Sequence, residues 1–201
     1  MAKVKHTKTA LKAQRDSLRR FERYLPTLQL KKQQLQMEVR QVEIRMEEKE
    51  AAENRLRSGI EAWIRLFGEP FDFPKHLRVE RIEQTTGNIA GVNIPVLQRV
   101  VFQRTPWDLF ETPSWVDDGI LALEELIRVR TERRFLEEAR RLLAEELRVT
   151  SQRVNLFEKV KIPECRENIR VIRIFLGDQQ TADVARGKLA KGRTIEKVRA
   201  A

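Results

Sequence analysis

The chain has 201 residues and a formal net charge of +10, from 40 Lys and Arg against 30 Asp and Glu. Because 35% of its residues are charged, against about a quarter in an ordinary compact domain, an extended fold is favoured over a compact one. No apolar stretch is long enough to span a membrane and no signal-peptide pattern begins the sequence, so we expect a soluble intracellular protein.

The positive charge is concentrated at the two ends of the sequence. Residues 1–20 carry a net charge of +6 and residues 186–201 a net charge of +5, whereas the residues between them carry −1. The basic surface is therefore predicted at the termini and not along the body of the chain.

Helix-breaking residues divide the sequence into three predicted domains. Five of the seven prolines fall within residues 70–113, whereas the first 58 residues contain no glycine and one proline. We predict a first coiled-coil helix in residues 1–67, an irregular segment with a β-hairpin in 68–113, and a second coiled-coil helix with a basic C-terminal tail in 114–201.

The first predicted helix, from about residue 8 to residue 67, carries apolar residues at heptad spacing. Such a narrow seam must be covered by another helix, so the pattern predicts a coiled coil. Pro26 is expected to bend the helix without ending it, because the seam continues in phase across the proline. Lys32, Lys49 and Glu53 interrupt the seam. Its apolar members are Leu18, Phe21, Leu25, Leu28, Leu35, Val39, Val42, Met46, Leu56, Ile60, Trp63 and Phe67.

The middle segment has two stretches of β-rich composition, Leu77–Glu83 and Val96–Gln103. The residues between them are rich in turn formers, notably 85–88 and Gly91, so the pattern predicts a β-hairpin. Both Gly87 and Gly91 are expected to serve turn geometry, where a positive φ is required.

The second predicted helix begins with Ser114 as its N-terminal cap. Its apolar seam starts at Val116 and restarts one residue out of phase at Phe135, which indicates a local change of supercoil. Pro163 is expected to end or bend the helix. The fold class predicted is mainly α: a long antiparallel two-helix coiled coil with a small β-hairpin at the bend, which brings both basic termini to one end.

No pattern typical of an active site is found, so no catalytic residue, cofactor or metal is predicted. Phosphate-binding glycine loops are absent. A single cysteine, Cys165, and two histidines cannot assemble a disulfide or a metal-ligand cluster, and Cys165 is better explained as a packed side chain than as a reactive thiolate. The glutamates of 43–53 alternate with basic residues and are expected to form a solvated, ion-paired helix face.

The basic ends allow several functional interpretations. They could bind nucleic acid, a membrane surface or an acidic protein surface, or simply be solvated tails. No nucleic-acid-binding motif is present, and neither end has the bulky apolar face of an interfacial helix. Residue chemistry alone therefore predicts a basic coiled-coil hairpin that binds a partner.

Three short motifs, in order along the chain, carry a family resemblance. They are Thr7-Lys8-Thr9-Ala10-Leu11, Gly91-Val92-Asn93-Ile94-Pro95, and Arg153-Val154-Asn155 followed by Ile162-Pro163. Together with the predicted helix, hairpin, helix order, they resemble the D subunit of the V-type and archaeal-type rotary ATPases, a central-stalk rotor protein.

The resemblance implies a non-catalytic rotor shaft that couples ATP hydrolysis or synthesis in a catalytic hexamer to translocation of protons or sodium ions. The implied partners are the catalytic and regulatory subunits of the hexamer, the small F subunit of the central stalk and a socket subunit of the membrane rotor, at the cytoplasmic face, without direct nucleic-acid binding or membrane insertion. The expected hexamer contacts are Thr7, Lys8, Leu11, Lys12, Lys188 and Lys191. The expected hairpin contacts are Val79, Ile82, Gly91, Val92, Pro95, Val100 and Phe102.

Two other functions compete with the rotor assignment. A basic coiled-coil scaffold would bind nucleic acid in a salt-dependent way. A prefoldin-like chaperone also joins coiled-coil helices through β-hairpins, but it needs exposed apolar surface near the helix ends, where this chain is basic.

Overall fold

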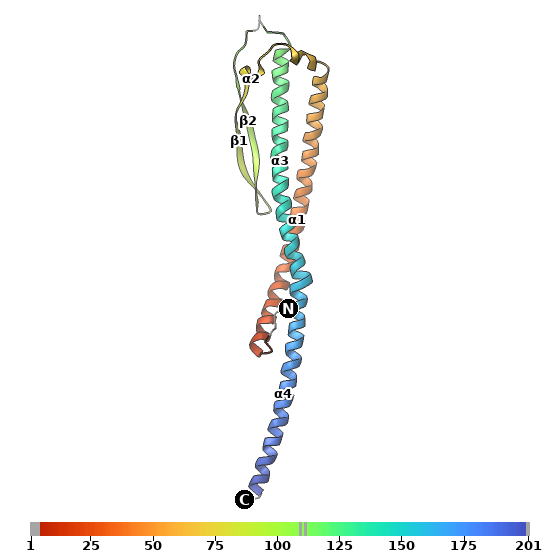
Figure 1. The fold of residues 1–201 in the computed structure, drawn as a ribbon, viewed down its shortest axis with the longest axis vertical. Helices are drawn as coiled ribbons and strands as arrows, with labels where there is room; N and C mark the ends of the chain where they lie inside the picture. The colour runs from red at the N-terminus through yellow and green to blue at the C-terminus, as the bar shows by residue number, and fades with distance from the viewer. Residues whose placement is uncertain (1–4, 109, 111, 200–201) are drawn as a thin grey trace. The chain divides into compact units, whose positions relative to one another are not determined.

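The computed structural model describes residues 5–108, 110 and 112–199, with the side chains of 194–199 outside the description. The chain forms two compact units: one combines residues 1–30 with 150–201, and the other comprises residues 31–149. We call them the terminal unit and the hairpin unit. In chain order the elements are α1 (Lys8–Glu61), a 3-10 helix η1 (Ile64–Gly68), α2 (Phe73–His76), β1 (Leu77–Ile89), β2 (Val92–Arg104), α3 (Val116–Leu156), a π-helical segment η2 (Phe157–Lys161) and α4 (Ile162–Arg199) (Figure 1).

In the hairpin unit, α1 and α3 pack side by side in opposite directions (Figure 1). Ion pairs that join them include Lys31 with Glu146 at 2.6 Å, Glu43 with Arg140 at 3.7 Å, and Lys49 with Glu132. As residue numbers rise on α1 they fall on α3, so the pairing is antiparallel. The mainly helical fold with an antiparallel hairpin is confirmed, while the supercoiling of the helices stays a prediction, as do the three domain boundaries.

The core of the hairpin unit lies where the helices meet the hairpin. Leu35 and Val42 from α1, Ala139 and Leu143 from α3, and Ile94 from β2 form one buried cluster. Leu35 and Leu143 are fully buried. Heptad spacing placed Leu35 and Val42 on the seam, and the hairpin completes the cluster because Ile94 points into it.

β1 and β2 form a two-stranded antiparallel sheet. Each strand has 13 residues and is longer than the sequence predicted. The turn is formed by Ala90 and Gly91, with φ values of 51° and 81°, as in a two-residue hairpin turn. The expectation that Gly91 serves the turn is confirmed, but the expectation for 85–88 is wrong because these residues belong to β1. Gly87 faces Ile94 across the sheet, and a Cβ there would lie 3.0 Å from Val96 Cγ2, so Gly87 is needed for close packing.

Aromatic rings fill the connections between the helices and the hairpin. Phe67 stands 5.2 Å from Phe73 and 5.3 Å from Trp115, measured between ring centroids. All three tryptophans belong to this network of ring contacts. Gly119 makes room for it, because a Cβ there would lie 3.2 Å from the Trp115 ring. The aromatic cluster comprises Trp63, Phe67, Phe71, Phe73, His76, Trp107 and Trp115.

In the terminal unit, the first part of α1 packs along η2 and α4. The Phe21 and Phe157 rings lie 5.0 Å apart, and Arg166 pairs with Glu22 at 2.9 Å. Pro26 lies inside α1, which confirms that it does not end the helix. Among the described side chains of this unit, the buried ones are Thr150, Val154, Ile162, Cys165, Ile169 and Ile172.

Helical structure continues through Pro163, so it does not end the helix. The proline follows the π-helical segment, in which the Ile162 amide donates to the Phe157 carbonyl, five residues back. A proline inside a helix lacks an amide donor and clashes with the carbonyl four residues before it, here Lys159. We attribute the wider π turn to this proline, because a π turn relieves that clash.

Candidate interaction surfaces

No group of metal-ligating side chains is found among the described residues, and no described helix is long and apolar enough to cross a membrane. Cys165 is 6% exposed. Its burial and the nearby Glu164 raise the pKa of the thiol, against a smaller opposing effect of Lys161. A raised thiol pKa disfavours the reactive thiolate, so Cys165 acts as a packed side chain.

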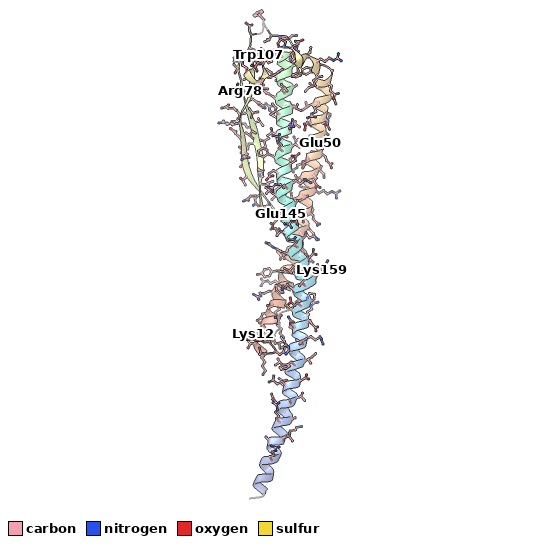
Figure 2. All side chains as sticks on the ribbon, in the orientation of Figure 1. Lys12, Glu50, Arg78, Trp107, Glu145 and Lys159 are labelled. Atoms are coloured by element: carbon pink, nitrogen blue, oxygen red, sulfur yellow. The ribbon has the colours of Figure 1, made fainter. Side chains whose placement is uncertain are left out.

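The residues predicted to contact a hexamer lie at the two ends of the terminal unit's sequence. Thr7 caps α1, since its Oγ1 accepts a hydrogen bond from the Ala10 amide at 3.2 Å. Lys12 is exposed on α1 (Figure 2). Lys8 lines a small depression with Asp183 of α4. The arrangement brings the start of α1 close to α4.

Lys188 and Lys191 belong to the C-terminal part of α4, and this part of the helix continues beyond the point where α1 begins (Figure 1). Every described side chain from 177 to 193 is exposed, so this part of α4 is open to solvent on all sides. The basic segments defined from sequence also include Lys3, Lys197 and Arg199, whose side chains lie outside the description. The two groups therefore lie on one unit, with the α4 lysines reaching past the α1 lysines.

The residues predicted as hairpin contacts differ in how much surface they present. Val79 and Ile82 on β1 are 42% and 46% exposed, whereas Val100, opposite Ile82, is 8% exposed. Gly91 is exposed at the turn, and the three others, Val92, Pro95 and Phe102, are half-buried. The β1 residues are thus the more accessible of this set.

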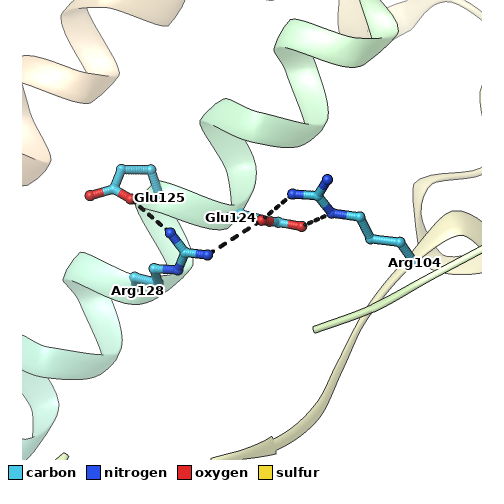
Figure 3. Close-up of polar contacts among 4 residues, drawn as sticks. All are labelled: Arg104, Glu124, Glu125 and Arg128. Atoms are coloured by element: carbon cyan, nitrogen blue, oxygen red, sulfur yellow. Dashed lines mark hydrogen bonds and ion pairs between the residues drawn. The ribbon is translucent and has the colours of Figure 1, made fainter. Parts of the chain in front are cut away.

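A charge cluster fixes β2 to α3 at the base of the hairpin (Figure 3). Glu124 on α3 is 3% exposed and accepts hydrogen bonds from Arg104 at 2.5 and 2.7 Å. Arg128 lies 3.6 Å from the same carboxylate and 5.5 Å from the centre of the Phe102 ring. Hydrogen bonding to Glu124 raises the pKa of Arg104. A buried carboxylate held by two guanidinium groups is a structural anchor.

A mainly apolar groove of about 400 Å³ lies between the hairpin and the two helices of the same unit. Ile89, Ile94 and Val96 line it from the hairpin, Val42 from α1, and Phe135 from α3. The Lys49–Glu132 ion pair belongs to its lining. The groove therefore presents an apolar surface with a charged edge.

Sequence reasoning missed the Glu124 anchor, the aromatic cluster and the burial of Glu53. The aromatic cluster had a signal, because all three tryptophans lie between residues 63 and 115. Glu53 was expected on a solvated face, but it is 4% exposed and pairs with Arg57 and Arg133. Glu124 had no signal beyond its position near the seam, since its partner Arg104 is 20 residues away.

The fold is that of a helical protein that acts through interaction surfaces. It has paired antiparallel helices, a hairpin anchored on α3, and long exposed helix faces. The family described as the D subunit of ATP synthase matches residues 10–192. The chain is 48% identical to the V-type ATP synthase D subunit of Borreliella burgdorferi over 99% of this chain and 98% of the relative. It is 37% identical to the V-type ATP synthase D subunit of Chlamydia muridarum, over 94% and 95% of the two chains.

The chain therefore belongs to the family of ATP synthase D subunits. This confirms the resemblance seen in the three sequence motifs. As a member of that family it is a stalk subunit of a rotary ATPase, forms a complex with other subunits of that ATPase, and is not itself the catalytic subunit.

Proposed function

We propose that this chain is the central-stalk rotor shaft of a V-type or A-type ATPase, where it couples ATP hydrolysis or synthesis in a catalytic hexamer to ion translocation by a membrane rotor. The antiparallel pairing of α1 with α3 carries the proposal. Four ion pairs between described residues, together with the cluster around Leu35 and Leu143, join the two helices. Two joined helices resist torsion better than one, because twisting either helix strains its contacts with the other.

The hairpin gives the shaft the asymmetry that a rotor needs. β2 is anchored on α3 through Arg104 and Glu124, so one side of the helix pair is covered by a sheet while other sides are helical. A nucleotide state of the hexamer drives rotation only if its binding free energy depends on the orientation of the shaft. Distinct faces on the shaft provide that dependence.

The surfaces suggest how the partners are arranged. Thr7, Lys8, Leu11, Lys12, Lys188 and Lys191 would face an acidic or carbonyl-rich sleeve formed by the catalytic and regulatory subunits. The accessible apolar residues of β1, Val79 and Ile82, would contact the small F subunit of the stalk, and a socket subunit would link the shaft to the membrane rotor at the cytoplasmic face. These assignments combine family membership with the exposure of each residue.

Co-expression with hexamer and small-stalk subunits tests the proposal. We expect a stable complex whose ATP hydrolysis drives rotation of a probe attached to this chain. The charge role is tested by changing Lys8, Lys12, Lys188 and Lys191 together to Gln, with an equal change at exposed Arg40, Arg55, Arg130 and Arg134 of the hairpin unit as control. The terminal variant should bind the hexamer more weakly and with less dependence on salt. Absence of any complex, or equal binding by both variants, would contradict these assignments.

The same preparation distinguishes the rotor from the two competing functions. A nucleic-acid scaffold predicts tight binding of a DNA or RNA oligonucleotide that weakens steeply with added salt. A prefoldin-like chaperone predicts suppression of aggregation of an unfolded test protein. Family membership favours the rotor over both.

A further inference from the structure

The first half of β1 has an uncovered outer edge. β2 carries the buried residues of the hairpin, Ile94 and Val100, whereas every residue from 78 to 82 of β1 is exposed. Among the described residues the sheet has two strands, so the backbone amides and carbonyls on the outer edge of β1 pair with no other strand. Such an edge is a template on which a partner can add a further strand.

The side chains along this edge are ordered so that they complement a second copy of themselves. Residues 78–83 read Arg-Val-Glu-Arg-Ile-Glu. When two copies of this segment run antiparallel about a two-fold axis between residues 80 and 81, each base faces an acid and each apolar side chain faces another. The facing pairs are Arg78 with Glu83, Val79 with Ile82, and Glu80 with Arg81. Opposite charges and apolar side chains placed directly across two strands stabilise their pairing.

A bulge in β1 makes this register possible. Residues that face each other across antiparallel strands project from the same side of the sheet, but residues three apart on a regular strand project from opposite sides. Glu80 is the extra residue of a bulge, which shifts the alternation by one. Val79 therefore pairs with Phe102, and Ile82 pairs with Val100. The two β2 residues lie two apart and share one side of the sheet, so Val79 and Ile82 share that side as well.

The charges of this edge are only partly neutralised within the chain. Among the described residues Glu80 has no ion-pair partner, and the Arg78 guanidinium donates only to a backbone carbonyl of α2. Glu83 is paired with Arg81 at 2.9 Å and with Arg99 at 2.6 Å. Charges on an edge protect it from indiscriminate pairing, because an uncharged strand would leave them without partners. A second copy of β1 supplies the missing partners.

We propose that two copies of this chain pair through their β1 edges as antiparallel strands, with Glu80 of each copy facing Arg81 of the other. The dimer has two-fold symmetry, in which one patch meets itself. It holds a continuous four-stranded sheet, and sheets of three or more strands are more stable than an isolated hairpin.

The dimer is expected to be weak. Pairing over residues 77–84 buries less than a standard interface of about 1,200–2,000 Å², so association should depend on protein concentration. The inference goes beyond the rotor function, because it concerns chains outside the ATPase, whose edge residues Val79 and Ile82 are free to pair.

Reversal of single charges on either side of the two-fold axis tests the proposal. In sedimentation equilibrium, the mass of the unmodified chain should rise with concentration from 23.7 kDa towards twice that value. Glu80→Arg sets base against base and Arg81→Glu sets acid against acid, so each should weaken self-association about tenfold. Glu47→Arg and Arg40→Glu make equal charge changes at exposed positions of α1 and should stay within about twofold of the unmodified chain. Circular dichroism confirms that each variant keeps its helical content.

Mixing the two edge variants is the sharper measurement. A Glu80→Arg chain and an Arg81→Glu chain should associate with each other about as strongly as unmodified chains, because every base of the first faces an acid of the second. The register is tested by oxidising a mixture of Val79→Cys and Ile82→Cys chains, which should yield a disulfide between the two kinds of chain. Val79→Cys alone should not cross-link, because the two copies of residue 79 do not face each other, and the native Cys165 is buried.

A chain that stays monomeric at every concentration would overturn the proposal, even if Val79 and Ile82 bind the small F subunit, because the occupant of the edge would then be another protein. Equal weakening by the edge and α1 variants, or failure of the two edge variants to associate when mixed, would overturn it too. These results leave the rotor function untouched, since the hexamer complex tests that function separately.

Discussion

Arg104, the last residue of β2, donates two hydrogen bonds to the buried carboxylate of Glu124 on α3. Arg104 is itself half exposed, so solvent reaches one side of the pair while the glutamate is nine-tenths or more buried. A carboxylate removed from water is stable only when it is paired and hydrogen-bonded. The position of the hairpin base on α3 is therefore set by this pair together with Arg128, and the packing of Ile94 sets the other end of the hairpin.

Arg104→Ala should weaken this anchor. Glu124 would keep only the longer contact to Arg128, so we expect the free energy of unfolding to fall by about 2 kcal/mol. Urea denaturation measures this loss, and hydrogen exchange should show faster exchange of the β2 amides near residue 104. Arg99→Ala is the matched control on the same strand, because Arg99 pairs with Glu83 at 2.6 Å away from α3. Equal effects of the two substitutions would refute the anchoring role.

The Glu83–Arg99 pair predicts a specific pH dependence. Hydrogen bonds from Arg99 lower the pKa of Glu83 from its ordinary value of 4.5, with smaller contributions from Arg81. Because the lowered pKa belongs to the folded state, the pair contributes its full stabilisation above pH 4.5 and loses it as the pH falls through the lowered pKa. NMR titration of the Glu83 side chain should show the pKa rising towards 4.5 in Arg99→Gln.

Arg78→Gln is the control for that titration, since Arg78 donates to the Pro74 carbonyl at 2.6 Å and not to Glu83. The Glu83 titration should be unchanged in this variant. Added salt should also move the pKa of Glu83 towards 4.5, because the pair is exposed to solvent. A Glu83 pKa that is indifferent to both Arg99 and salt would contradict the assigned cause.

The sequence predicted the elements that depend on local patterns. Heptad spacing located α1 and α3, because an apolar seam on a helix must be buried, whichever element it packs against. The continuity of the seam across Pro26 correctly indicated an uninterrupted helix. The one-residue change of phase at Phe135 indicated a local change of supercoil, which stays a prediction, and the π-helical segment at 157–161 had no signal of its own in the heptad pattern.

The features that the sequence did not predict depend on contacts between distant residues. Residues 85–88 have turn composition but form strand, because their partners on β2 supply the hydrogen bonds of a longer ladder. Glu53 resembles its solvated neighbours, yet α3 brings Arg133 to it and buries it. The groove lined by Arg15, Arg19, Arg166 and Arg173 could not be predicted, because a helical period does not specify which residues of α1 and α4 face each other.

Gly91→Ala should destabilise the hairpin turn. Gly91 has φ of 81°, a left-handed conformation in which a Cβ atom clashes with the backbone. We expect the free energy of unfolding to fall by about 1 kcal/mol. Gly91→Asn should lose less, because asparagine tolerates this conformation better than alanine. Urea denaturation compares the two, and an alanine variant as stable as the asparagine variant would show that the turn relaxes without cost.

The pair of buried Glu53 with half-buried Arg133 is expected to add little net stability. The two side chains approach at 3.5 Å, but neither Glu53 Oε2 nor Arg133 Nε has a hydrogen-bond partner among the described residues. Removing both charges should therefore be neutral or stabilising, by up to about 2 kcal/mol in the double variant Glu53→Leu with Arg133→Leu.

Arg133→Leu alone should instead be destabilising by about 2 kcal/mol, because the buried Glu53 would keep only its exposed partner Arg57. Urea denaturation of the wild-type chain, both single variants and the double variant closes a double-mutant cycle that isolates the coupling energy of the pair. The expected order of stability places the double variant above Arg133→Leu. If the double variant were instead the least stable of the four, the pair would contribute net stability. Glu53 Oε2 and Arg133 Nε would then have hydrogen-bond partners outside the folded chain.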